Sequence, residues 1–118
     1  MAPLGPYKLV TVNSVPERAK RLVGRVCEDV KDRYLIEHAG NADDISQVEA
    51  VVRQVQPDLL FTASMWTPQQ SQEAQEVAKR IVPGIKTFAL PQGLQADQGP
   101  DAVVEFIKDH LPALIEGR

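Results

Sequence analysis

The sequence predicts one α/β domain in which a four-stranded parallel sheet lies between two layers of helices, a three-layer αβα arrangement. Short apolar runs rich in β-branched residues alternate four times with segments whose apolar residues recur every three or four positions. The runs at 7–13, 57–64 and 85–90 are the most apolar, as expected of strands buried on both faces. Strands that alternate with helices form parallel crossover units, and 118 residues suit one domain.

The first unit joins the strand at 7–13 to a helix with one apolar face. Ser14 and Glu17 have the S-x-x-E spacing of a capping box, so we expect them to start this helix. Its buried face is formed by Ala19, Leu22, Val23, Val26 and Val30.

The second unit begins with a strand at 33–38, followed by a turn at 40–44. Asp44 and Gln47 suggest the N-terminal cap of the next helix. The apolar face of that helix is formed by Ile45, Val48, Val52 and Val55.

The third unit has the clearest helix start in the chain. Thr67 has the position of an N-cap, Pro68 that of the first helical residue, and Gln70 follows the cap by three residues. The helix should end before Pro83, with a buried face of Ala74, Val77, Ala78 and Ile81.

The fourth unit contains a strand at 85–90 and a Gly/Pro/Gln-rich loop at 91–99. Pro100 is expected to open the last helix, and Pro112 to kink or end it. The face turned to the core is formed by Val103, Val104, Ile107 and Leu111.

Four such units with right-handed crossovers predict the strand order 2-1-3-4, as in flavodoxin-like and Rossmann-like folds. The second strand, which contains Glu37 and His38, is the most polar and suits an edge. We expect residues 1–118 to form one domain with a disordered or extended terminus at 1–6. The ending "IEGR" at 115–118 matches a protease site used to remove affinity tags, so it is either native chain or a remnant of a tag.

Composition and charge narrow the possible functions. A net charge of −3 without a concentrated basic face argues against a nucleic-acid partner, and no apolar tract is long enough to cross a membrane. The first residues carry no pattern of a signal peptide. Cys27 is the only cysteine, which excludes an internal disulfide and indicates a reducing, cytoplasmic location.

Motifs that would assign a chemistry to this topology are absent from the sequence. Neither G-x-G-x-x-G nor the P-loop pattern occurs, so no nucleotide cofactor is expected. Cys27 and Arg33 have the C-x5-R spacing of a phosphocysteine loop, but Cys27 lies within a predicted helix and acids intervene. A response-regulator receiver needs paired acids after the first strand and an acceptor Asp after the third, where this chain has Asn13 and Ser64 with their neighbours. The resemblance to these families is therefore one of topology.

A candidate site lies where the winding direction of the sheet reverses, beyond the carboxyl ends of the first and third strands. The candidate ligand-binding residues in the loops there are Asn13, Ser14, Arg18, Ser64, Met65, Trp66, Thr67, Gln92 and Gly93. Trp66, the only tryptophan, either offers a flat wall to a ligand or packs over the end of the sheet. Arg18 either holds a phosphate or carboxylate at a helix start or is simply solvated. His38 with Asp43 and Asp44 is too sparse a set for a metal site, and none is predicted.

The leading hypothesis is a module that binds a small molecule or a protein partner in this crevice, because the crevice loops carry no histidine or acid for proton transfer. The first alternative is a small enzyme in which Ser14 or Ser64 acts with Arg18 on an anionic substrate. The second alternative is a structural subunit, for example a homodimer in which the exposed edge of the strand at 85–90 pairs with a second copy.

Overall fold

The computed structural model describes residues 3–117, in which four parallel strands form one sheet in the order β2-β1-β3-β4. The strands are β1 (Leu4–Val12), β2 (Tyr34–Ala42), β3 (Leu59–Thr62) and β4 (Lys86–Ala89). The helices are α1 (Pro16–Val30), the 3-10 turn η1 (Ile45–Gln47), α2 (Val48–Val55), α3 (Pro68–Ile81) and α4 (Leu94–Glu116). The predicted fold class and strand order are confirmed.

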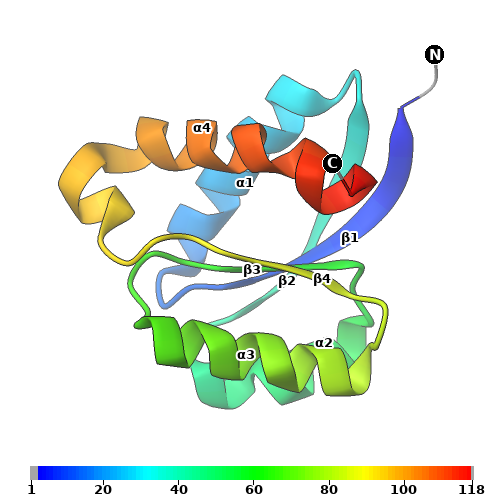
Figure 1. Cartoon of the computed structure of the whole chain (residues 1–118), viewed down its shortest axis with the longest axis vertical. Helices are drawn as coiled ribbons and strands as arrows, with labels where there is room; N and C mark the ends of the chain where they lie inside the picture. Colours follow the sequence, from blue (N-terminus) through cyan, green and yellow to red (C-terminus); the bar gives the residue numbers. More distant parts are fainter. Residues whose placement is uncertain (1–2, 118) are drawn as a thin grey trace.

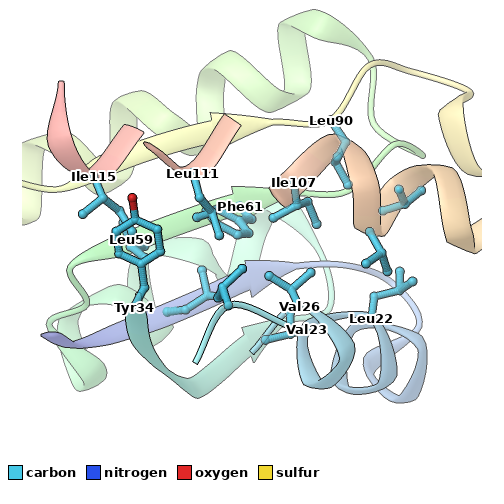
Figure 2. Close-up of a cluster of buried hydrophobic side chains, with 14 residues drawn as sticks. Leu22, Val23, Val26, Tyr34, Leu59, Phe61, Leu90, Ile107, Leu111 and Ile115 are labelled. Atoms are coloured by element: carbon cyan, nitrogen blue, oxygen red, sulfur yellow. The ribbon is translucent and has the colours of Figure 1, made fainter. Parts of the chain in front are cut away.

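Figure 1 shows the sheet between two helical layers, with α1 and α4 on one face and α2 and α3 on the other. Each layer has its own core. The α1/α4 core contains Leu22, Val26, Tyr34, Leu59, Phe61, Ile107, Leu111 and Ile115 among others (Figure 2). The α2/α3 core contains Val10, Val12, Ala42, Val48, Val52, Leu60, Ala74, Ala78 and Ile85. The helical faces that face the sheet are those predicted from the apolar spacing, although Ile45, Val55, Val77 and Ile81 are only partly buried.

β2 is longer than predicted, because residues 40–42 belong to the strand rather than to a turn. Val10 of β1 pairs with Gly40, and Val12 pairs with Ala42. A Cβ atom at Gly40 would lie 3.3 Å from the side chain of Val55, so glycine permits the close approach of α2. Residues 40–42 are of types that favour turns, but β1 provides the backbone hydrogen-bond partners that hold them in a strand.

The prediction of a loop at 91–99 is also largely wrong, because α4 starts at Leu94. Gly99 interrupts the helix with φ 86° and ψ 176°, and Pro100 then opens the second part, as predicted. Pro112 does not end the helix, which continues to Glu116. Burial of Ile115 in the α1/α4 core holds the last turn in place despite the hydrogen bond that the proline removes.

The two predicted capping boxes that precede α1 and α3 have opposite outcomes. Thr67 and Gln70 form both reciprocal hydrogen bonds of the box, at 3.1 and 2.9 Å. Ser14 does not cap α1: the N-cap is Val15, which makes no side-chain cap. Pro16 occupies the first helical position and thereby places Ser14 one residue too early for the box.

Asp44 and Gln47 do not form the expected capping box either, because the Gln47 side chain accepts a hydrogen bond from the N–H of Asp43 instead. At the C-terminus, Ile115 and Glu116 of the "IEGR" ending take part in α4, whereas Arg118, Met1 and Ala2 lie outside the described residues. Within residues 3–117, none of the helices has the length and apolar character needed to cross a membrane.

Candidate functional site

The loops that follow β1, β3 and β4 meet at the carboxyl ends of these strands, where the sequence placed the crevice. The Ser14 hydroxyl donates to the Met65 sulfur over 2.8 Å, and the backbone N–H of Ser14 lies 3.3 Å from the same atom. The N–H of Gly93 donates to the carbonyl of Ser64 over 2.8 Å. Hydrogen bonds thus tie the three loops to one another.

Asn13 and Ser64 lie just after β1 and β3, and both are buried. The Asn13 side-chain oxygen accepts the N–H of Val15 at 2.8 Å, and its backbone carbonyl accepts from the Asn41 amide at 3.1 Å. The Ser64 hydroxyl accepts the N–H of Gln95 at 3.3 Å. These polar groups therefore shape the turns after β1 and β3 and join the start of α4 to the sheet.

Trp66 both covers the end of the sheet and faces an open hollow. Its indole N–H donates to the carbonyl of Val12 over 2.8 Å, and its ring packs against the α2/α3 core. The same residue lines a groove of about 510 Å³ that also involves Ser71, Gln75 and Gln92. We call this hollow between α3 and the end of β4 the α3 groove.

A second hollow of about 510 Å³ opens at the mouth of the crevice, and we call it the mouth hollow. It is lined by Arg18, Ser64, Met65, Gln92, Gly93, Gln95 and Ala96. Five of the predicted site residues thus share one hollow, while Ser14, hydrogen-bonded to Met65, lies next to it. Thr67 does not line it, because its side chain caps α3.

A third hollow adjoins the mouth hollow, since Arg18 and Gln95 line both. It has a volume of about 240 Å³ and is lined by Arg18, Arg21, Leu22, Arg25, Gln95 and Pro100. Arg25 makes a salt bridge of 2.8 Å to Asp101, whereas Arg18 and Arg21 have no ionic partner among residues 3–117. We call it the arginine hollow.

Reasoning from the sequence missed the arginine hollow, although a signal was present. Arginines at positions 18, 21 and 25 recur every three or four residues and so share one face of α1. The sequence could not show that the first part of α4 folds beside this face, because residues 94–98 were expected to form a loop. The helix start at Leu94 brings Gln95 to the hollow.

His38 lies away from the crevice, on the edge strand β2. Its Nε2 atom shares a hydrogen bond of 2.8 Å with the Thr11 hydroxyl, which also donates to Asn41 at 2.6 Å. Burial lowers the pKa of His38 below its ordinary value, and the charge of Lys20 lowers it further, against a backbone hydrogen bond to Gly40 that raises it. Among residues 3–117, no three His, Cys, Asp or Glu side chains come together as metal ligands.

Comparisons with known proteins identify the fold on which this site lies. No model of a known protein family matches the chain, and no curated protein matches it by sequence. The crystal structure of the non-phosphorylated receiver domain of the stress response regulator RcsB from Escherichia coli is 13% identical, with a TM-score of 0.59 over 97% of this chain and 96% of that chain. The isolated RcsB receiver domain of Salmonella enterica serovar Typhimurium, with the phosphomimetic BeF3−, is 10% identical, with a TM-score of 0.56 over 86% and 73%.

A longer RcsB chain from Salmonella typhimurium is 12% identical, with a TM-score of 0.62 over 98% of this chain. The protein spans 62% of that chain, and 44% of another RcsB chain from the same source. Together these similarities show that the chain has the flavodoxin-like fold of response-regulator receiver domains.

Proposed function

We propose that this domain binds an anionic segment of a protein partner across the mouth hollow and the arginine hollow. The observation that carries the proposal is the arginine face of α1, where three arginines line one hollow and only Arg25 of the three has an acidic partner among residues 3–117. Guanidinium groups bind carboxylate and phosphoryl oxygens through paired hydrogen bonds. Gln92 and Gln95 add amide groups beside Arg18. The predicted site residues Arg18, Ser64, Met65, Gln92 and Gly93 belong to the same surface.

The shapes of the hollows favour a protein partner over a buried small molecule. A small hollow of about 30 Å³ reaches from Asn13 to Phe61 and Ile107. That volume corresponds to one water molecule, whereas sites for small ligands enclose roughly 300–1,000 Å³ of mostly apolar space. The larger hollows are open at the surface and are lined in part by arginine and glutamine side chains, which suits an extended segment of another protein.

The hydrogen bonds of the crevice weigh against the enzyme hypothesis. Of its two candidate nucleophiles, the Ser14 hydroxyl donates to the Met65 sulfur and the Ser64 hydroxyl accepts the N–H of Gln95. Catalysis by serine needs a general base within hydrogen-bond reach, and His38 is engaged with Thr11 on β2 instead. A phosphoacceptor carboxylate is also missing from the ends of β1 and β3, so we infer that the domain acts without being phosphorylated there.

The test is a titration of the protein into a fluorescein-labelled peptide of alternating glutamate and glycine, followed by anisotropy. We expect Arg21→Gln to weaken binding by about tenfold at low salt, the effect of one lost charge-assisted hydrogen bond. Arg53→Gln is the matched control, because Arg53 is exposed on α2 and pairs with Glu49. Equal losses in both variants, or no binding by the unaltered protein, would contradict the proposal.

The same assay separates the sources of the anion. Inorganic phosphate and AMP are added as competitors of the labelled peptide, and a phosphorylated version of the peptide is compared with the plain one. A partner segment predicts that unlabelled peptide competes at far lower concentration than either small anion. Competition by AMP or phosphate at micromolar concentration would replace the protein partner with a small ligand.

A further inference from the structure

β4 leaves one of its edges without a pairing strand. Among residues 3–117, β4 pairs with β3 alone. The N–H of Lys86 donates to Asp58 and that of Leu90 to Thr62, so alternate residues of β4 point toward β3. The N–H and C=O groups of Thr87 and Ala89 therefore point away from the sheet. Figure 1 views the sheet from this side, and no helix or strand lies in front of β4.

The side chains at this edge form an aromatic surface on the side of α4. The rings of Phe88 and Phe106 lie 5.5 Å apart, and His110 stacks on Phe106 at 4.2 Å. Phe88 and Phe106 are only partly buried, and His110 is exposed. An edge with free backbone groups and an aromatic flank is a surface to which another strand can be added.

We propose that a second copy of this chain occupies the edge, with the two β4 strands antiparallel and Phe88 opposite Phe88 of the second copy. In that register Thr87 of one copy lies opposite Ala89 of the other, and each such pair exchanges two backbone hydrogen bonds. The interface then satisfies both outward donors and both outward acceptors of each copy. The result is a continuous eight-stranded sheet, formed from two copies of the four-stranded one.

The self-complementarity of the strand is the reason to choose a second copy over another protein. The outward residues Thr87 and Ala89 lie symmetrically about Phe88, so a two-fold axis through Phe88 satisfies both copies at once. Lys86 is the charge that ordinarily protects such an edge. In this register it lies opposite Leu90 rather than opposite the second Lys86, so the pairing brings no like charges together.

The first test is static light scattering on the purified protein from micromolar to millimolar concentration. We expect the mass to rise from 13.0 kDa toward twice that value. Thr87→Pro removes an outward N–H that has no hydrogen-bond partner among residues 3–117, so the fold should survive while dimerisation weakens by about tenfold or more. Thr87→Ser is the matched control, because it keeps that N–H. Thermal unfolding and circular dichroism verify that each variant is folded.

The second test fixes the register and does not need Thr87→Pro to fold. In a Cys27→Ser background, Phe88→Cys places two thiols across the axis with Cα atoms about 4.5 Å apart, within the range of a disulfide. We expect a cross-linked dimer under mild oxidation. Lys86→Cys in the same background is the control and should stay unlinked.

A mass that stays near 13.0 kDa at every concentration overturns the proposal, as does equal dimerisation of Thr87→Pro and Thr87→Ser. A monomer whose Thr87 and Ala89 amide signals shift only when another protein is added would assign the edge to that protein instead. Cross-linking of Lys86→Cys but not of Phe88→Cys would overturn the register. The peptide assay of the arginine hollow is independent of these results, because Arg21 and Thr87 lie on different surfaces.

Discussion

The two helical layers of this domain pack against the same sheet with different kinds of side chain. The buried residues of α2 and α3 are small: Val48, Val52, Ala74 and Ala78 are wholly buried, and Ser71 is 4% exposed. The α1/α4 layer also contains valines but adds the larger residues Leu22, Ile107, Leu111 and Ile115, and it contains the hollow of about 30 Å³. Both proposed interaction surfaces also use the α1/α4 layer, through the arginines of α1 and the aromatic residues of α4.

The largest expected effect tests the layer with the large side chains. Leu111 is 1% exposed in the α1/α4 core, and Leu111→Ala should lower the free energy of unfolding by about 2–5 kcal/mol. Val52→Ala in the α2/α3 core should cost less, because it removes fewer carbon atoms. Urea denaturation of both variants measures the difference. A larger loss for Val52→Ala would reverse the comparison and show that stability depends chiefly on the small-residue layer.

A smaller effect of opposite sign is expected at two threonines on adjacent strands. Thr62 alternates with Phe61 and so faces the α2/α3 layer, where its hydroxyl is buried without a hydrogen-bond partner among residues 3–117. Thr62→Val should raise the free energy of unfolding by about 1 kcal/mol, because it removes an unsatisfied polar atom. Thr11→Val is the matched change on the other face and should destabilise, since that hydroxyl bonds to His38 and Asn41. Destabilisation by both would mean that the Thr62 hydroxyl is hydrogen-bonded in solution.

The smallest expected effect is a pH dependence at the rim of the α1/α4 layer. Because burial holds the pKa of His38 below its ordinary 6.5, the unfolded chain takes up the proton at a higher pH than the folded chain does. The stability contributed by neutral His38 is therefore present above pH 6.5 and is lost as the pH falls through the lowered pKa. Thermal unfolding at pH 7.5 and pH 5.5 should show a larger loss for the unaltered protein than for His38→Gln. Equal losses would mean that His38 titrates alike in both states.

The two capping boxes predicted beside the crevice show that a local sequence pattern predicts local contacts but not contacts with distant segments. Thr67 and Gln70 cap α3 as their spacing predicts, because a capping box involves only residues within one turn. Ser14 has the same spacing to Glu17, yet its hydroxyl contacts Met65, fifty-one residues away in the sequence. Because Pro16 is the first helical residue, α1 starts too late for Ser14 to cap it. Met65, in the loop after β3, is the hydrogen-bond partner of Ser14 instead. Five of the nine candidate residues line one hollow, but their role in binding stays a prediction.

The sequence by itself determined the four strand–helix units, the order of the strands and the apolar faces of the helices. These follow from the spacing of apolar residues and from the right-handed crossover, which act over a few residues or apply to any such chain. Only the tertiary structure decided that residues 40–42 extend β2, that Leu94 starts α4 and that three arginines line one hollow. Each of these depends on a neighbour distant in the sequence, whose pairing or packing outweighs the local preference for a turn or loop.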